Sequence, residues 1–477
     1  MSLTRSIAHN TAIQIIGKGV STLLGFAAVA IMTRTLGVEK FGWYITTTGF
    51  LQFIGIISDF GFTVTTSNML SEPAFDKKKL LNTIFTWRFL TALIFQGLAP
   101  LLILFFPYPR EIKIAVTIIT VSFFALALQQ VFIGYCRAHL RVVMVTWAEI
   151  LGRVALVIGV ALAAWRHAGF LPMMAAITVA SILSAGYMWT KILPIRFCLD
   201  RAISKALFYK MWPTALSVIF NAFYLQADRV ILPLYVSQAE VGIYGAAYRV
   251  LDITIQIAAI VMGLIMPLIT YAWSRNLKEE FARRYQLSFD LLCLILLPMI
   301  AGIVVLAQPI MRLIAGRDFS GAGELLKWLG LSIFGTCFGM VFGHIALAIN
   351  RQKQALWIYA SDAILSLIGY FIFIPRYGFW GAVGVTIFSE FYAGLGLAIL
   401  TIYYTGAAPR LLAFLKIVVA SVLMGLLVAW VQPLNIVFSI LLGIAAYGAL
   451  VLALRIISIS TIKEVLSFKK VAFSPEN

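Results

Sequence analysis

Residues 11–33 read TAIQIIGKGVSTLLGFAAVAIMT, an apolar run of 23 residues whose single charge is Lys18. A helix needs about 20 such residues to cross a hydrocarbon core of roughly 30 Å. Comparable runs recur along the whole chain. We therefore predict an all-α integral membrane protein of about fourteen spanning helices, at residues 11–33, 41–66, 81–106, 112–135, 143–165, 171–193, 211–235, 241–271, 286–309, 323–349, 355–375, 380–405, 411–431 and 435–455.

Composition supports a membrane environment. Of the 477 residues, 62% are hydrophobic and 12% are charged, and the mean hydropathy is +0.97, whereas soluble domains are near half apolar and a quarter charged. The predicted loops are too short for a soluble catalytic domain, and the chain has no P-loop, HExxH, GxSxG or DxD sequence. We therefore predict that the protein is not an enzyme and uses no cofactor.

The distribution of basic residues predicts the orientation. If the N-terminus is cytoplasmic, the inner loops and tails hold 20 Lys and Arg residues, and the outer loops hold 8 when Lys113, at the start of 112–135, is counted with them. Because cytoplasmic loops collect Lys and Arg, both termini are predicted to be cytoplasmic. The same bias accounts for the net charge of +18 without a nucleic-acid partner.

Metal and disulfide chemistry is not expected. The four cysteines stand far apart without a CxxC pair, and the four histidines are widely spread. His344 falls inside a predicted helix with no ligand partner at helical spacing. No metal site is therefore predicted.

The chain contains a trace of internal duplication. LGVEKFGWY at 36–44 aligns with VSQAEVGIY at 236–244, at an offset of 200 residues, and a weaker echo pairs 168–170 with 377–379. Short Gly-aromatic turns also recur by chance, but two matches at equivalent positions favour two six-helix lobes plus a terminal pair. Such repeats are typical of transporters. The predicted domains are 1–195 (helices 1–6), 196–405 (helices 7–12) and 406–477 (helices 13–14 and a cytoplasmic tail).

Charged residues inside the predicted helices are costly and usually face a bundle interior or a wet cavity. Some have a purely structural interpretation: Glu149 and Arg153 are spaced for an i,i+4 pair, Arg249 and Asp252 for an i,i+3 pair, and Lys416 for snorkelling. The charges on corresponding helices of the two lobes favour a central cavity for an anionic head group. The candidate head-group residues are Lys18, Arg88, Arg229 and Arg249, and the candidate H⁺ or Na⁺ coupling residues are Asp59, Asp228 and Asp252.

Three stretches resemble the bacterial polysaccharide transporter family of the multidrug/oligosaccharidyl-lipid/polysaccharide exporter superfamily. The first is residues 32–62, with RTLG at 34–37, FGWY at 41–44 and SDFG at 58–61. The second is ADRVILPLYVSQAEVGIYGAAYRVLD at 227–252. The third combines NRQKQALW at 350–357 with PRYGFWGAVGVTIFSE at 375–390. Each motif is degenerate, and their order and spacing carry the resemblance.

The resemblance implies two pseudo-symmetric lobes that open alternately to each side of the bacterial inner membrane. It implies a flippase for undecaprenyl-diphosphate-linked oligosaccharide repeat units of O-antigen, capsule or exopolysaccharide, with the last two helices holding the lipid tail. Membrane lipids, a polysaccharide polymerase and a chain-length regulator are the implied partners. Two alternatives remain: a cation-coupled multidrug antiporter of the same superfamily, and a membrane-embedded polymerase or glycosyltransferase.

Overall fold

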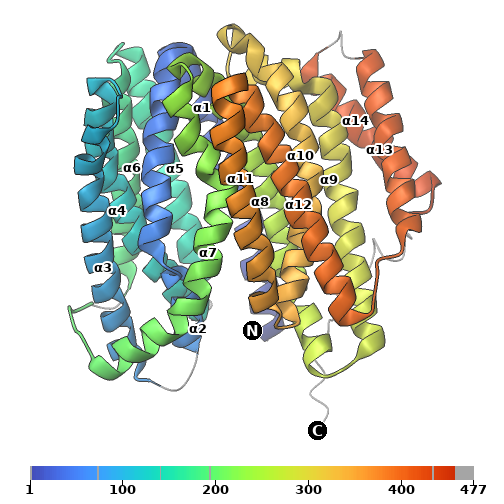
Figure 1. Ribbon diagram of the computed structural model, residues 1–477, viewed down its shortest axis with the longest axis horizontal. Coiled ribbons are helices and arrows are strands. Elements are labelled where there is room, and N and C mark those ends of the chain that lie inside the picture. Colours follow the sequence, from blue (N-terminus) through green and yellow to red (C-terminus); the bar gives the residue numbers. More distant parts are fainter. Residues whose placement is uncertain (1–2, 72–74, 140, 193–194, 432–434, 457–477) are drawn as a thin grey trace. The chain divides into compact units, whose positions relative to one another are not determined.

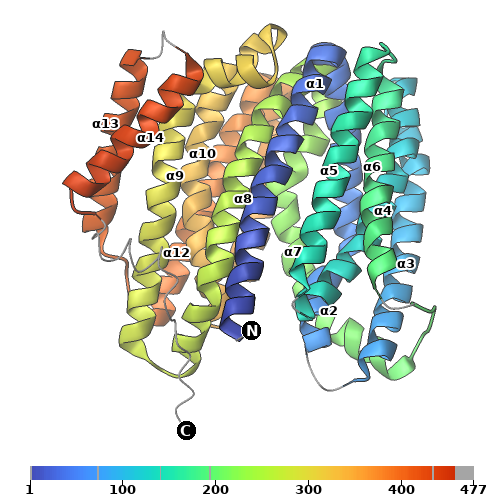
Figure 2. The ribbon, with the colours of Figure 1, turned by 180° about the vertical axis from the view of Figure 1, so that it is seen from behind.

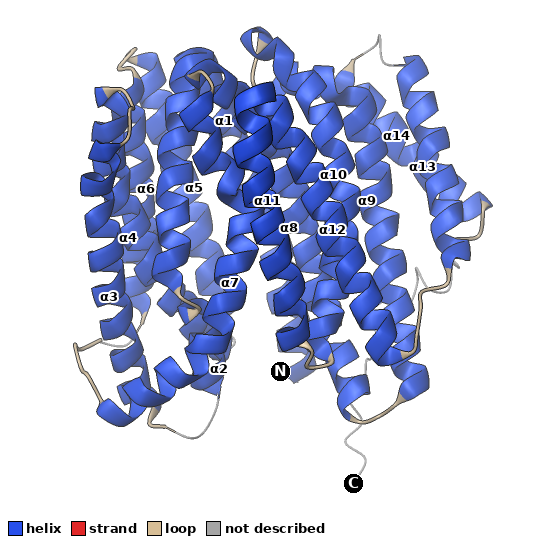
Figure 3. Cartoon of the chain, in the orientation of Figure 1, coloured by secondary structure: helices blue, strands red, loops and turns tan. Residues whose placement is uncertain are grey.

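The computed structural model describes residues 3–71, 75–139, 141–192, 195–431 and 435–456, and this part of the chain is helical between short loops and turns (Figure 3). The described residues contain no β-strand. The elements are α1 (Leu3–Asp59), α2 (Phe62–Ser71), α3 (Lys77–Leu102), η1 (Ile103–Phe105), α4 (Arg110–Ala138), α5 (Val142–Trp165), α6 (Phe170–Lys191), α7 (Arg201–Tyr235), α8 (Gln238–Ser274), α9 (Lys278–Ile314), η2 (Arg317–Phe319), α10 (Ser320–Ala348), α11 (Gln352–Tyr377), α12 (Phe379–Thr405), α13 (Leu411–Val431) and α14 (Ile436–Ala453).

The all-α membrane fold is confirmed. Among the described residues, twelve helices are long and apolar enough to cross a membrane. One of the twelve, Ile16–Asp59, overlaps the first two predicted segments, 11–33 and 41–66, and α7 is not among the twelve. The count of fourteen and the cytoplasmic placement of both termini stay predictions.

The second predicted segment, 41–66, is wrong as one continuous helix. Before this segment, α1 is already kinked at Gly37, which has a φ of 71°. Within the segment, the helix breaks at Phe60 and Gly61, whose φ values are 41° and 79°, so α1 ends at Asp59 and α2 begins at Phe62. Only glycine adopts a positive φ at little cost, and hydropathy alone does not detect such a break.

The chain divides into two compact units. The first comprises Met1–Arg249, Met311–Leu325 and Leu356–Ser389. Within it, α5 packs against α1 and α6, and α4 packs against α3 and α6 (Figures 1 and 2). A core that includes Phe62, Phe85 and Phe132 joins α2, α3 and α4.

The second unit comprises Val250–Ile310, Leu326–Ala355 and Glu390–Asn477. Here α13 and α14 pack on each other, and Met424 and Val428 of α13 pack on Leu306 of α9. The hydroxyl of Tyr447 on α14 donates a hydrogen bond to the carbonyl of Leu294 at 2.8 Å. The C-terminal helix pair is therefore attached to α9 by both apolar and polar contacts.

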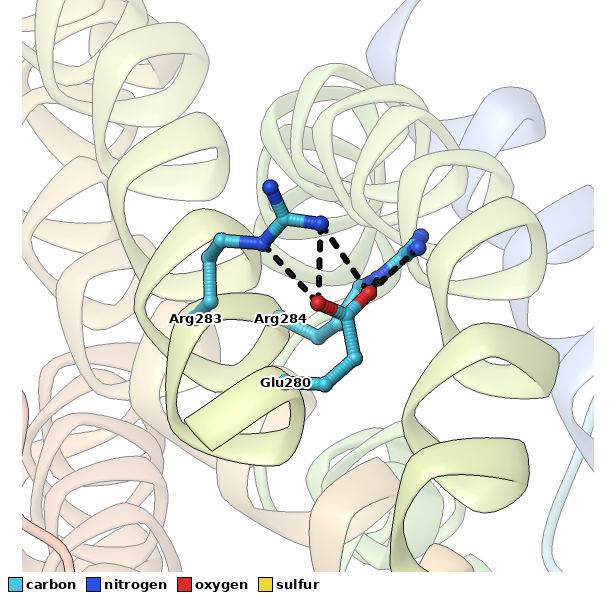
Figure 4. Close-up of polar contacts among 3 residues, drawn as sticks. All are labelled: Glu280, Arg283 and Arg284. Carbon is cyan, nitrogen blue, oxygen red and sulfur yellow. Dashed lines mark hydrogen bonds and ion pairs between the residues drawn. The ribbon is translucent and has the colours of Figure 1, made fainter. Parts of the chain in front are cut away.

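The first turn of α9 carries a small ion network. The Glu280 carboxylate forms ion pairs with Arg283 at 2.8 Å and with Arg284 at 2.6 Å (Figure 4). An acidic residue in the first turn also complements the positive end of the helix dipole. The predicted domains 1–195, 196–405 and 406–477 do not correspond residue by residue to these units and stay a prediction.

Candidate functional site

The two glycines aligned by the sequence repeat meet in space. Gly42 of α1 and Gly242 of α8 face each other, and a Cβ built on either one would lie 3.0–3.1 Å from the backbone nitrogen of the other. The same Cβ atoms would overlap the carbonyl oxygens of Gln238 and Val38. The two helices therefore cross at backbone contact, and the crossing places corresponding parts of the repeat side by side.

This crossing brings arginines onto tyrosine rings. Arg249 of α8 donates from Nη2 to the Tyr44 hydroxyl of α1 at 3.0 Å, and its guanidinium carbon lies 5.5 Å from that ring centroid. Arg229 of α7 lies 4.7 Å from the centroid of Tyr248. Both arginines are partly buried. Cation–π contact orients a guanidinium without neutralising its charge.

A buried carboxylate lies beside these rings. Asp228 has 0% exposed surface, and its Oδ2 accepts a hydrogen bond from the Tyr244 hydroxyl at 2.7 Å. The Tyr244 and Tyr248 rings are 5.0 Å apart. We call these six residues the arginine–tyrosine cluster: Tyr44, Asp228, Arg229, Tyr244, Tyr248 and Arg249.

The predicted residue Lys18 lies elsewhere, between α1 and α5. Its Nζ is 2.7 Å from Glu149 Oε1, and each side chain keeps 33% of its surface exposed. Ser21 donates to the same carboxylate oxygen at 3.0 Å. Glu149 thus pairs across two helices, and the neighbouring Arg153, which we expected as its i,i+4 partner, approaches α1 at Gly25.

Arg88 and Asp59 form a third, more closed group. Arg88 Nη2 is 3.0 Å from Asp59 Oδ1, and Arg88 also donates to the carbonyls of Ser58 at 2.7 Å and Ala127 at 3.2 Å. The Arg88 side chain is 4% exposed. A cation at a helix C-terminus complements the dipole and satisfies terminal carbonyls. Arg88 therefore holds the end of α1 beside the Phe60–Gly61 break.

The structure places six of the seven predicted residues in the first unit, in three groups. Arg229, Arg249 and Asp228 belong to the arginine–tyrosine cluster, Lys18 lies between α1 and α5, and Arg88 pairs with Asp59. Asp252, one turn beyond Arg249 on α8, falls in the second unit. Their roles in substrate binding and ion coupling stay predictions.

Sequence reasoning missed a polar group on α11 and α12. Asp362 is completely buried, with Ser389 donating to Oδ2 at 3.0 Å and Ser366 donating to Oδ1 at 3.2 Å. Nearby, Thr386 contacts the hydroxyls of Tyr370 at 3.2 Å and Tyr248 at 3.4 Å. The contact between Asp362 and Ser366 could have been predicted from their i,i+4 spacing, whereas the contact with Ser389 depends on helix packing.

The chemistry of the arginine–tyrosine cluster suits an anionic oxygen ligand. Guanidinium groups bind phosphate oxygens through two parallel N–H bonds, and tyrosine rings also pack against sugars and hold the arginine planes. Among the described residues, no three His, Cys, Asp or Glu side chains are grouped in a way that could hold a metal ion.

Two family models and two curated proteins are similar to this chain in sequence. The model of the polysaccharide biosynthesis protein family matches residues 7–273, and the MatE model matches residues 213–372. The probable low-salt glycan biosynthesis flippase Agl15 of Haloferax volcanii is 24% identical over 401 residues, 82% of this chain and 81% of that protein. The succinoglycan biosynthesis transport protein ExoT of Rhizobium meliloti is 25% identical over 345 residues, 69% and 66% of the two chains.

Solved structures share the fold. The lipid II flippase MurJ, in an inward closed conformation, matches with a TM-score of 0.76 at 15% identity, covering 95% of this chain and 99% of that one. An inward-facing multidrug MATE transporter matches with a TM-score of 0.65 at 16% identity, covering 81% and 94%. These matches agree with the predicted superfamily. Since the first family model spans more than half of its length, this multi-pass membrane chain belongs to the polysaccharide biosynthesis protein family.

Proposed function

We propose that this protein is a flippase that moves undecaprenyl-diphosphate-linked oligosaccharide repeat units across the bacterial inner membrane by alternating access. Family membership and the two curated relatives, a glycan biosynthesis flippase and a succinoglycan transport protein, support glycan transport. The match to nearly the full length of a lipid II flippase supports a lipid-linked cargo. The transported repeat unit belongs to an O-antigen, a capsule or an exopolysaccharide.

The observation that carries the substrate class is the arginine–tyrosine cluster. Every repeat unit carries the same undecaprenyl chain and the same diphosphate, and the diphosphate needs cations when it leaves the water of the head-group region. Arg229 and Arg249 supply fixed charges at helix positions held by Tyr248 and Tyr44. The sugars vary, and aromatic faces accept them with little demand on their identity.

Ion coupling is the second part of the proposal. The protein works without a cofactor and exchanges H⁺ or Na⁺ at Asp59, Asp228 or Asp252. A carboxylate that closure removes from water gains proton affinity, and a neighbouring arginine opposes that gain. Asp228 is buried next to Arg229, so both effects act on one residue.

The proposed partners follow from the cargo. A flippase delivers repeat units to the outer face, where a polysaccharide polymerase joins them and a chain-length regulator sets the length of the polymer. The protein is a transporter in this scheme and forms no covalent bond in its substrate.

The test is alanine substitution of Arg229 and Arg249 in the producing cell. We expect cytoplasm-facing lipid-linked repeat units to accumulate and surface polysaccharide to disappear, while the amount of membrane-inserted protein stays unchanged. Arg166→Ala, at an exposed arginine after α5, is the matched control and keeps normal export. Normal surface polysaccharide in both cluster variants would contradict the role of the cluster.

A second candidate is the cation-coupled multidrug antiporter. The MatE match at residues 213–372 and the fold shared with MATE transporters favour it. The two functions differ in an efflux experiment: a flippase deletion changes surface polysaccharide and leaves the export of cationic dyes unchanged, whereas an antiporter deletion raises dye retention.

A further inference from the structure

The connection between α6 and α7 forms an ordered surface segment. We call residues 195–212 the basic strap. Figures 1 and 2 show that the first turns of α7 run across the ends of the neighbouring helices, whereas the later part of α7 runs along them. A helix in this position lies near a membrane–water boundary if α3 to α6 span the membrane.

Contacts with α3 hold the strap in place. The backbone N–H groups of Arg196 and Cys198 donate to Asn82 Oδ1 at 3.1 Å and Thr86 Oγ1 at 3.0 Å. Trp87 Nε1 donates to Ser204 Oγ at 2.9 Å. These side-chain partners replace the backbone partners that a loop lacks. The strap is therefore part of the folded first unit.

The helical part of the strap has two different faces. Ile203, Leu207 and Met211 are spaced four residues apart, are at most 4% exposed and belong to the apolar core of the first unit. Asp200 caps the helix by accepting from the Ile203 N–H at 2.9 Å. One face is thus fully used by packing.

The opposite face carries basic and aromatic residues together. Arg201 and Lys205 are exposed one turn apart, and the same side continues with Tyr209 and Trp212, which are 84% and 58% exposed. Before the helix, Phe197 is 64% exposed beside the exposed Arg196. Trp and Tyr side chains are enriched at membrane–water interfaces, and Lys and Arg beside them attract anionic lipids.

The strap charges differ from those of the other long basic stretch, at the start of α9. There Glu280 binds both Arg283 and Arg284 (Figure 4). Within the described residues, Arg201 and Lys205 take part in no ion pair, and the one acidic residue of the strap, Asp200, is engaged in the helix cap. The strap therefore presents net positive charge to its surroundings.

We propose that the basic strap binds the head groups of anionic phospholipids at the cytoplasmic bilayer surface. Its lysines and arginines attract the negative lipid surface, and its exposed aromatic rings insert between head groups and acyl chains. Because the core-facing side of the strap packs on α2 and α3, lipid composition then acts directly on the first unit. This proposal does not depend on which substrate the protein transports.

The native Cys198 provides the test, because it is partly exposed while Cys136, Cys293 and Cys337 are buried. The full chain is placed in nanodiscs of phosphatidylcholine alone or of equal parts phosphatidylcholine and phosphatidylglycerol. The rate of Cys198 alkylation by an uncharged polyethylene-glycol maleimide is then measured. For the wild type we expect slower alkylation in the anionic discs. Arg201→Gln/Lys205→Gln weakens lipid binding by roughly fivefold for each lost charge. In this variant the alkylation rates in the two kinds of disc should therefore be equal.

Two control variants make the result specific. Arg201→Lys/Lys205→Arg keeps both positive charges, and its alkylation rates should differ between the two kinds of disc as in the wild type. This variant separates the loss of charge from the loss of the fold. Lys278→Gln/Arg283→Gln removes the same charge from the α9 stretch and also keeps the difference. Equal alkylation rates of the wild type in the two kinds of disc would overturn the proposal. So would a wild-type difference between the discs in Arg201→Gln/Lys205→Gln, or equal rates in Lys278→Gln/Arg283→Gln.

Discussion

Two arginine environments in the first unit differ in what holds the guanidinium. Arg88 is 4% exposed and bound to a carboxylate and to backbone carbonyls at the end of α1. Arg229 and Arg249 are partly buried and lie on tyrosine rings. A buried guanidinium that is bound to carboxylate and carbonyl oxygens stabilises the fold, whereas a partly buried one that lies on a tyrosine ring is a candidate for binding an anionic ligand. The comparison separates a structural arginine from candidate ligand-binding arginines.

The largest effect is expected at the first environment. Arg88→Met removes the cation that pairs with Asp59, whose side chain is 19% exposed, and should destabilise the folded protein by at most about 3–5 kcal/mol. Thermal unfolding of the purified protein in detergent measures this. The double variant Arg88→Met/Asp59→Leu removes both charges and should recover part of the loss, and a double variant no more stable than Arg88→Met would show that the ion pair is not the cause.

The next effect concerns the crossing that supports the second environment. Gly42→Ala places a methyl group against the Gln238 carbonyl, so α1 and α8 must separate and Tyr44 moves from Arg249. Overpacking of this kind costs about 1–3 kcal/mol, and transport should fall with it. Gly97→Ala is the matched control because a Cβ there meets nothing within 4 Å. Equal unfolding temperatures for the two variants would argue against the close crossing.

A smaller effect should follow from changing the shape of the charge at Arg229. Arg229→Lys keeps one positive charge but loses the planar group that stacks on Tyr248 and binds two oxygens at once. We expect export of the repeat unit to fall between the wild-type and Arg229→Ala levels, with an unchanged unfolding temperature. A variant with wild-type export would show that charge alone suffices at this position.

The smallest effect should come from Tyr44→Phe. This change removes the hydroxyl that accepts from Arg249 at 3.0 Å and keeps the ring beneath the guanidinium. Export should decrease only slightly, whereas Tyr44→Ala, which removes the ring as well, should decrease it further. If both variants export equally, the ring makes no contribution to holding Arg249.

The amino-acid sequence by itself determined the membrane class and the places where the chain is helical. Hydropathy is a local property, so apolar runs such as 112–135 and 411–431 lie on α4 and α13. The repeat at 36–44 and 236–244 predicted that Gly42 and Gly242 are equivalent. Hydropathy did not predict the helix break at Phe60–Gly61 or the start of α7 at Arg201, because backbone angles and interfacial helices have little effect on it.

Only the tertiary structure decided which charges meet. Lys18 and Glu149 are 131 residues apart, and Asp362 and Ser389 are 27 residues apart, so helix packing rather than sequence spacing selects each partner. The same packing assigned Arg88 to the end of α1 and placed Arg249 on Tyr44. The reason is physical: a charge inside a membrane protein must find a partner or a wet cavity, and the partner is chosen by which helix faces come together.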